Sequence, residues 1–530
     1  MSAAAHPSLT RQPSDLIGGE WIAHAPGAVL TSTNPAHPRE VVWAGAPVPA
    51  HVDAAVAAAR GAFPAWAALG FEKRAAVLRR YQSCASERGE QVAALIRDEV
   101  GKPMWDAKAE AALLGAKVDI TLDPVGSIQR VMGYEVGLSA SRVGKAWFRP
   151  HGVMAVLGPF NFPAHLPNGH IIPALAMGNT IVLKPSDKAP AVGQLLAELF
   201  DQALRAEGAP SGVFNLVQGG AEVASRLVAH DDIDGVLFTG SWPVGRRIMQ
   251  ANLDRPGRIL ALEMGGNNAA VIMPDADLKQ AVIECVRCAF ISAGQRCTCT
   301  RRLIVHREVA HRVIPALCKA AAQLIIGDPR ATHPVFMGPV ISGAARQAIL
   351  EAQTSMQRAG GESLIEMTGA GVGAEGWYVT PGVMTVAKFE SGSGADGPLL
   401  SAGADIEVFG PLLRVCIVES LDEAIDQANA SRFGLAASIF THDQANIEQF
   451  QNRVRAGCTN VNTGTAGASS KLPFGGLGLS GNHRPAGAFS VDYCAYPVAG
   501  MVESADAATM MPGMRFEDGW LGQEPSGANR

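Results

Sequence analysis

Between residues 152 and 263, short apolar runs alternate with longer amphipathic stretches. Runs of strand length lie at 153–157, 180–183, 213–217, 235–238 and 258–262, and a helical pattern separates each run from the next. Strands that alternate with helices predict a doubly wound parallel sheet, in which ligands bind beyond the carboxyl ends of the strands. We therefore expect functional side chains in the turns that follow these runs.

The same alternation resumes further along the chain. Strands are predicted at 269–273 and 302–306, with a helix at 277–293 between them. Upstream, Gly and Pro predict hairpins over 17–47, and helical periodicity occupies 51–117. The predicted fold class is therefore α/β, with two doubly wound parallel-sheet domains.

Composition narrows the class of protein. A chain of 530 residues is too long for one ordinary core, and 48% hydrophobic with 18% charged residues is typical of a globular protein. The formal net charge of −5 predicts no general affinity for nucleic acid. The sequence contains no apolar run long enough for a membrane span, and its first residues lack the apolar run of a secretory signal, so we expect neither. Nine cysteines without regular spacing favour a reducing compartment, so we expect a cytoplasmic protein.

Two short segments suggest the chemistry. Glu263 lies in Leu-Glu-Met-Gly-Gly-Asn, and Cys297 ends Gly-Gln-Arg-Cys, 34 residues downstream. A thiol nucleophile and a separate carboxylate base are the groups that a two-step reaction through a thioester requires. Alone, each segment has a plainer interpretation, because Gly-Gly strings form turns and buried cysteines fill cores.

Other candidate groups follow the predicted strands. Asn161, in Gly-Pro-Phe-Asn-Phe-Pro, could donate a hydrogen bond to an oxyanion, or could be an ordinary turn residue. The turn Phe-Thr-Gly240-Ser241, with Gly245 after it, lies where a strand meets a helix, and amides there can hold a pyrophosphate.

The cysteine spacing raises a further possibility. Cys285, Cys288, Cys297 and Cys299 could suggest a zinc site, but the first two lie within an amphipathic helix pattern and no suitably spaced His follows. We therefore predict no metal. Cys299 is close enough in sequence to Cys297 for a reversible bond under oxidation, which is a hypothesis from proximity.

Taken together and in this order, the motifs resemble the aldehyde dehydrogenase superfamily over roughly residues 15–500. The resemblance implies that Cys297 is the nucleophile, that Glu263 activates water and that Asn161 is half of the oxyanion hole. It also implies an NAD cofactor, with NADP possible, held by Lys184, Ser186, Asp187, Phe160, Gly240, Ser241, Gly245, Glu407 and Phe409. The family carries Glu where this chain has Asp187, which leaves the choice of cofactor open.

Several segments resemble one subfamily, the N-succinylglutamate 5-semialdehyde dehydrogenases of arginine catabolism. They are 158–170, 263–268, 293–299, 480–485 and 492–497; the stretch 462–467 and the tail after Val502 depart from it. A substrate with several carboxylates predicts cationic groups at its entry, and the candidates are Arg296, His165, His483 and Arg484.

The resemblance also predicts the domains. Residues 1–130 and 151–263 would bind NAD, 264–465 would form the catalytic domain, 131–150 and 478–502 an oligomerisation flap, and 503–530 a C-terminal tail. A homodimer or tetramer would cover the exposed ribbon of the flap.

Alternative functions remain open at this point. The chain could oxidise another semialdehyde or an aliphatic aldehyde, or it could be a non-catalytic NAD-binding structural protein. A CoA-acylating enzyme is disfavoured because it has no use for the base at Glu263. A cofactor-free cysteine hydrolase is disfavoured because no ordered Cys–His pair is evident.

Overall fold

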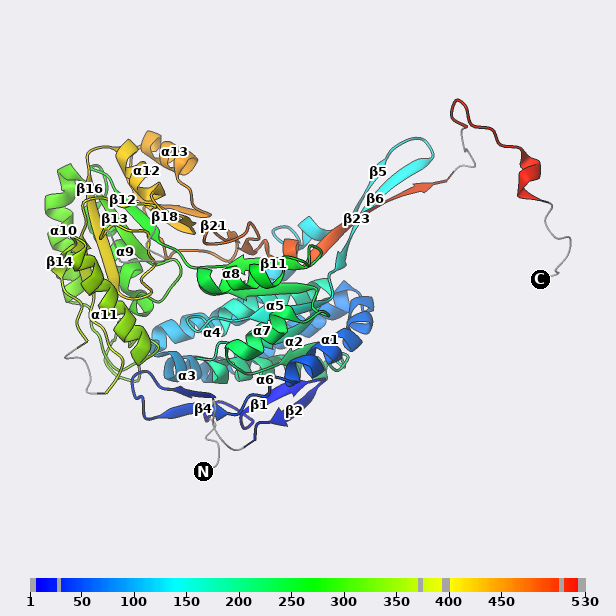
Figure 1. The fold of residues 1–530 in the computed structure, drawn as a ribbon, viewed down its shortest axis with the longest axis horizontal. Helices are drawn as coiled ribbons and strands as arrows, with labels where there is room; N and C mark the ends of the chain where they lie inside the picture. The colour runs from blue at the N-terminus through cyan, green and yellow to red at the C-terminus, as the bar shows by residue number, and fades with distance from the viewer. Residues whose placement is uncertain (1–5, 26–29, 370–374, 393–400, 505–509, 523–530) are drawn as a thin grey trace. The chain divides into compact units, whose positions relative to one another are not determined.

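Two seven-stranded sheets organise the computed structural model, which describes residues 6–25, 30–369, 375–392, 401–504 and 510–522 (Figure 1). The chain divides into two compact units. The first comprises Met1–Val131 and Arg149–Tyr496 and contains both sheets, and the second comprises Met132–Phe148 and Pro497–Arg530.

The first sheet is parallel through five strands and ends in an antiparallel pair. Its order is β11 (Ile259–Glu263), β10 (Gly235–Thr239), β7 (Val153–Leu157), β8 (Thr180–Lys184), β9 (Phe214–Leu216), β1 (Ser14–Ile17) and β2 (Glu20–Ala23).

Every residue of β7, β8 and β10 is buried, because helices cover both faces of the sheet. Met154 and Val156 join one core, and the alternate residues Val153 and Ala155 join another on the opposite face. The helices that surround this sheet are α1 (His51–Ala68), α2 (Phe71–Glu87), α3 (Gly89–Val100), α4 (Met104–Leu122), α5 (His165–Met177), α6 (Pro190–Ala206), α7 (Ala221–Ala229) and α8 (Trp242–Ala251).

The second sheet is also mainly parallel. Its order is β14 (Glu362–Ile365), β15 (Gly382–Thr385), β16 (Leu412–Val418), β13 (Thr300–His306), β12 (Asn268–Ile272), β18 (Ala436–Phe440) and β19 (Cys458–Val461), with only β14 antiparallel to its neighbour. Its helices are α9 (Leu278–Phe290), α10 (Arg307–Ala322), α11 (Gly343–Arg358), α12 (Leu421–Asn429) and α13 (Gln444–Arg453). The α/β class predicted from the alternating pattern is confirmed.

The remaining strands are short. They pair as β3 (Leu30–Thr33) with β4 (Val41–Gly45), β17 (Phe433–Gly434) with β21 (Leu477–Gly478), and β20 (Pro473–Phe474) with β22 (Ala486–Gly487). Strands β20, β21 and β22 lie within residues 462–487, a stretch rich in Gly, Ser and Pro that has no regular pattern over its length.

A three-stranded ribbon occupies the second unit, in the order β23 (Ala495–Glu503), β6 (Arg142–Pro150) and β5 (Tyr134–Gly137). The predicted flap included residues 478–496, but this segment belongs to the first unit. Ser480 accepts a hydrogen bond from the backbone of Met264, and Asn482 pairs with the backbone of Leu262 and Leu260. In the described part of the predicted tail, a 3-10 helix spans Asp518–Leu521.

Within the described ranges, no single helix has the length and apolar composition needed to cross a membrane. The pair α1 and α2, bent by 117°, passes that test only when the two helices are joined.

Candidate active site

A cavity of about 890 Å³ lies within the first unit and is lined by residues from both sheets. The lining includes Cys297, Glu263 and Asn161, the three residues predicted to be catalytic. It also includes most of the predicted cofactor residues, namely Phe160, Lys184, Ser186, Asp187, Gly240, Ser241, Glu407 and Phe409. Groups that are up to about 250 residues apart in sequence therefore share one cavity.

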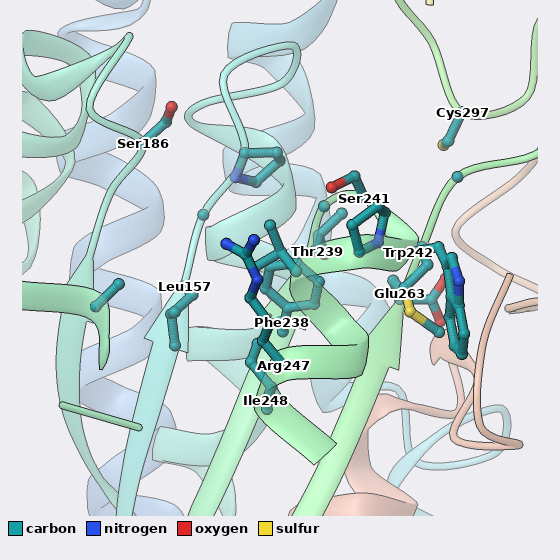
Figure 2. Close-up of a pocket in the computed structure, with 18 of the residues that line it drawn as sticks. Leu157, Ser186, Phe238, Thr239, Ser241, Trp242, Arg247, Ile248, Glu263 and Cys297 are labelled. Carbon is teal, nitrogen blue, oxygen red and sulfur yellow. The ribbon is translucent and has the colours of Figure 1, made fainter. Parts of the chain in front are cut away.

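The first sheet contributes side chains from the carboxyl ends of its strands, as predicted. Asn161 follows β7, Lys184 ends β8, Ser241 follows β10, and Glu263 ends β11. Because neighbouring parallel strands end at the same edge, these four positions converge on the cavity. Figure 2 shows two of them, Ser241 and Glu263, with Cys297.

The second sheet contributes from the opposite ends of its strands. Cys297 lies three residues before β13, and Glu407 and Phe409 lie just before β16. The amino ends of these strands face the cavity, so the loops that enter them carry the functional groups.

The loop that carries Cys297 has an unusual backbone. Ser292 and Ala293 adopt positive φ values of 53° and 55°, a backbone conformation that residues other than Gly rarely adopt. Gly294 follows with φ 71°, and a Cβ atom there would lie 2.1 Å from the carbonyl oxygen of Gly410. Strain of this kind persists only where the surroundings hold the segment firmly.

Arg301 provides much of that hold. Its buried guanidinium donates to the carbonyl oxygens of Gly294 (3.1 Å), Arg296 (2.9 Å) and Gly266 (3.0 Å). It also donates to the carbonyl of Val408 (2.8 Å) and meets a carboxylate oxygen of Glu407 at 3.3 Å. One side chain therefore ties the Cys297 loop to the segments before β12 and β16.

Asn268 holds the cysteine itself. Its side-chain amide donates to the carbonyl oxygens of Cys297 (2.7 Å) and Cys299 (2.8 Å). Gly266 passes so close that a Cβ atom would lie 2.6 Å from the Cys297 carbonyl oxygen, which explains why this position is glycine. Asn161 reaches the same loop from the first sheet, donating from Nδ2 to the carbonyl of Gln295 at 3.0 Å.

The Cys297 thiol and the Glu263 carboxyl group both have raised pKa values. Burial raises the pKa of Cys297 to about 12, and the negative charges of Glu263 and Glu407 add to the effect. Burial also raises the pKa of Glu263 well above its usual range, and only the backbone N–H of Ala486 opposes this. The Oε2 atom of Glu263 has no hydrogen-bond partner among the described residues, so a water or substrate atom could meet it.

The cofactor candidates provide both charge and backbone donors. Burial lowers the pKa of Lys184 to about 8, although the nearby Asp187 opposes this. Asp187 lies 3.7 Å from Lys188, and the hydroxyl of Ser186 accepts from the backbone of Lys188. Ser241 is the N-cap of α8 and makes no side-chain cap bond, so its hydroxyl and the backbone N–H of Trp242 can face a ligand.

Of the other cofactor candidates, Glu407, Phe160 and Phe409 line the cavity, whereas Gly245 does not. Glu407 accepts from the backbone N–H of Gly266 at 3.0 Å, and the rings of Phe160 and Phe409 meet edge to face at 5.9 Å. A Cβ atom at Gly245 would lie 2.3 Å from the sulfur of Met264, so packing accounts for this glycine.

The four predicted substrate residues do not line this cavity. The Arg296 guanidinium pairs with Asp106 at 2.7 Å and lies 5.0 Å from the centre of the Phe162 ring. His483 and Arg484 are exposed, and Arg484 donates to the carbonyl of His483.

His165 does not supply the positive charge expected of it. Burial lowers its pKa to about 3, and the charges of Lys117 and Lys102 lower it further, so the imidazole is neutral near pH 7.

Sequence reasoning missed Arg301 and Asn268. A signal was present for Arg301, because Thr-Arg-Arg begins an otherwise apolar strand and a buried arginine needs many acceptors. Asn268 had no comparable signal, since an Asn after two glycines is typical of a turn.

The other three cysteines of the possible zinc set are buried. Cys285 and Cys288 are buried on α9, and Cys299 is buried with its sulfur 3.9 Å from the carbonyl oxygen of Ile291. All nine cysteines are free thiols. Among the described residues, no group of three or more His, Cys, Asp or Glu side chains is arranged to hold a metal ion.

Comparison with known proteins gives one family. The sequence model of the aldehyde dehydrogenase family matches residues 21–497. An N-succinylglutamate 5-semialdehyde dehydrogenase from Caulobacter vibrioides is 44% identical, covering 93% of this chain and 97% of that one. One from Chromobacterium violaceum is 41% identical, covering 92% and 96%.

Solved structures agree in fold. An NAD-dependent aldehyde dehydrogenase from Sinorhizobium meliloti superposes with a TM-score of 0.85 at 29% identity, over 95% of this chain and 97% of that one. An NADP-dependent enzyme from E. coli superposes with a TM-score of 0.83 at 30% identity, over 93% and 98%.

Proposed function

The chain belongs to the aldehyde dehydrogenase family, so it is an NAD(P)-dependent aldehyde oxidoreductase, and we propose that it oxidises N-succinyl-L-glutamate 5-semialdehyde to N-succinyl-L-glutamate with NAD. The observation that supports the chemistry is the meeting of Cys297, Asn161 and Glu263 at one cavity that also carries cofactor candidates. The names of the relatives support the substrate.

Cys297 acts first in the proposed mechanism. Its sulfur attacks the aldehyde carbon, and its proton passes to a base. Burial raises the pKa of both Cys297 and Glu263, and the charge of Glu263 raises that of Cys297 further, so the two groups resist being ionised together. Glu263 can therefore accept the thiol proton as the thiolate forms.

The attack creates an oxyanion. The Asn161 amide and the backbone N–H of Cys297 are the proposed donors, and Arg301 and Asn268 keep that segment of backbone in place. A nicotinamide cofactor held beside Glu407, Phe409 and Phe160 would supply the hydride acceptor for oxidation to the thioester. Glu263 then releases the thiol proton to solvent and takes a proton from the water that attacks the thioester. The C–S bond breaks, which releases the carboxylate and leaves Cys297 as the thiolate.

The residues fit a dinucleotide. Lys184, Ser186 and Asp187 would hold the adenine-side ribose, Gly240 and Ser241 the phosphates, and Glu407 with Phe409 and Phe160 the nicotinamide side. NAD is the proposed cofactor because the Asp187 carboxylate can accept from a ribose hydroxyl but repels the phosphate that NADP carries there.

The first test compares substrates. Purified protein with NAD should form NADH fastest with N-succinylglutamate semialdehyde, more slowly with glutamate semialdehyde, and slowest with propanal. Turnover of the simple aldehyde alone would discard the proposed substrate while keeping the chemistry. For the base, Glu263→Gln should slow the first NADH formed per site, because the Cys297 thiol loses its proton acceptor, and should then stall at the thioester. Steady turnover at the wild-type rate would exclude both roles of Glu263.

The cation sites for the substrate carboxylates remain proposals. Arg296 precedes Cys297 directly, and Arg484 lies near the exposed segment after β21. If either binds a carboxylate, its Ala variant should raise the KM for the succinylated aldehyde and leave the KM for propanal unchanged. His483, beside Arg484, is a weaker candidate.

We also propose a homo-oligomer in the cytoplasm. Strand β5 is an edge of the ribbon and exposes Tyr134 and Val136, with Leu138 exposed just after it, so pairing with a second copy would cover it. Val136→Lys should shift the mass measured by light scattering toward the monomer. The free cysteines suit a reducing compartment.

A further inference from the structure

Arg247 is a cation of the cavity that the proposed mechanism does not use. It lies in the second turn of α8, lines the cavity and is exposed. Within the part of the chain that the structure describes, its side chain makes no hydrogen bond or ion pair. Figure 2 shows the side chain projecting into the pocket beside Ile248. An unpaired guanidinium in a ligand cavity is free to recognise the ligand.

The walls around Arg247 are small and apolar. Helices α7 and α8 pack beside each other, and both contribute to the lining. On α8, Val244, Arg247, Ile248 and Ala251 recur at helical spacing on the side that faces the cavity. The apolar lining residues from α7 are Ala221, Ala224, Val228 and Ala229. These walls suit a flat, weakly polar group.

The proposed cofactor supplies such a group, and the inference rests on that proposal. The nicotinamide ring must lie near Cys297, because the hydride leaves a carbon bonded to that sulfur. The phosphates are expected at Ser241, the N-cap of α8. The remaining end of the dinucleotide, the adenine base, then lies between α7 and α8.

We propose that the Arg247 guanidinium stacks on the adenine ring of the bound dinucleotide and so selects for the adenosine half. The planar guanidinium stacks well on aromatic faces, and the apolar residues Val228 and Ile248 can contact the ring as well. Arg247 lies six residues beyond the N-cap, or about 9 Å along the helix axis, so its position favours the base over the phosphates.

The test measures dissociation constants for NAD, AMP and nicotinamide mononucleotide in the full-length protein. Arg247→Gln removes the charge and the planar cation, Arg247→Lys keeps the charge, and Arg247→Trp restores a flat stacking surface without charge. Arg246→Gln is the matched control, because Arg246 is exposed on the same helix and does not line the cavity.

If Arg247 stacks on adenine, Arg247→Gln and Arg247→Lys should raise the dissociation constants for NAD and AMP by about threefold to tenfold. The Trp variant should stay within about twofold of wild type, and nicotinamide mononucleotide should bind equally to all variants. If Arg247→Lys kept the full affinity for NAD and Arg247→Trp lost it, Arg247 would contact a phosphate through its charge, and the inference would be overturned. Unchanged NAD binding by Arg247→Gln would also overturn it. A wild-type protein that binds no NAD would instead overturn the proposed function.

Discussion

The two sides of the active-site cavity are built by opposite strategies. The first sheet presents Asn161, Lys184, Ser241 and Glu263 from the carboxyl ends of parallel strands, where regular hydrogen bonding already fixes the backbone. The second sheet presents Cys297 and Glu407 from loops that enter the amino ends of its strands. Such loops have no ladder to hold them, and here buried side chains do so.

The difference is visible in the hydrogen bonds. Glu263 is placed by the register of β11 against β10, in which Thr239 lies opposite it. Cys297 is placed by Asn268 and Arg301, which between them hold the carbonyl oxygens of Cys297, Arg296 and Gly294. A regular element positions one group, and a network of buried polar side chains positions the other. The second arrangement should be more sensitive to single substitutions outside the cavity.

The largest expected effect is at the cysteine itself. Cys297→Ala should lower kcat by about 10⁴-fold or more, because among the described residues that line the cavity no other cysteine could form the thioester. NADH formation with a saturating aldehyde measures this. The matched control is Cys299→Ala, a buried thiol outside the cavity, which should keep activity within about tenfold. If Cys299→Ala were as inactive as Cys297→Ala, the assignment of the nucleophile would be wrong.

Substitution of Asn161 tests how much the side of the cavity built by the first sheet stabilises the transition state. Asn161→Ala removes one oxyanion donor and should lower kcat by about 10²–10³-fold with little change in NAD affinity. Single-turnover kinetics separates this chemical step from binding. An Asn161→Ala variant with wild-type kcat would leave the backbone N–H of Cys297 as the sole donor and would reduce the role of the first sheet to cofactor binding and the base.

Arg301 tests how the second side is held. Arg301→Lys keeps a charge but cannot reach the several carbonyl oxygens at once, so the Cys297 loop should lose its fixed position. We expect kcat to fall by about 10- to 100-fold, because even a small misplacement of a reacting group slows the chemical step by such factors. Arg302→Lys is the matched control. Arg302 is the next residue in β13, also buried, but it donates to Asn267 and to carbonyl oxygens at the end of α12.

Both variants should lower the melting temperature, since each disturbs a buried charge with many acceptors. Only Arg301→Lys should also slow catalysis and change the rate at which iodoacetamide modifies Cys297. Equal losses of kcat in the two variants would show that general stability, and not the position of the loop, explains the effect.

The same contrast explains how much of the fold and of the active site could be predicted from the sequence. The period of apolar runs located β7, β8, β10 and β11 to within a residue or two, and the turns after them yielded Asn161, Ser241 and Glu263. The rule that ligands bind at carboxyl ends gave no guidance for the second sheet. Cys297 was proposed from the chemistry that a thiol and the Glu263 carboxylate could perform together, and Glu407 only from the resemblance, because nothing local in their loops requires a cavity.

The residues that sequence reasoning missed or misjudged depend on long-range contacts. Arg301 gains its role from carbonyl oxygens up to 107 residues away, and such contacts leave no local pattern. His165 was expected to be cationic, but its charge is set by burial and by Lys117 and Lys102, which come from other elements. Gly245 matched a cofactor turn, whereas its neighbour Met264 is what requires glycine there.

The smallest expected effect is on stability, and it concerns Glu263. Its pKa is raised in the folded protein, so the fold favours the protonated form and loses stability as pH rises above the unfolded value of 4.5 toward the folded pKa. Glu263→Gln should therefore melt at a higher temperature than wild type at pH 8, and the gap should shrink near pH 5. Scanning fluorimetry at both pH values measures this.

Asp15 is the control of opposite sign. Burial alone would raise its pKa, but hydrogen bonds from His24, His51 and the backbone of Gln218 outweigh burial and lower it. Its stabilising contribution is present above pH 3.8 and is lost as pH falls through the lower folded value, so Asp15→Asn should melt below wild type at pH 8. If Glu263→Gln also melted lower at pH 8, the Glu263 carboxylate would have a stabilising partner, and the first side of the cavity would be held by a polar network as the second side is.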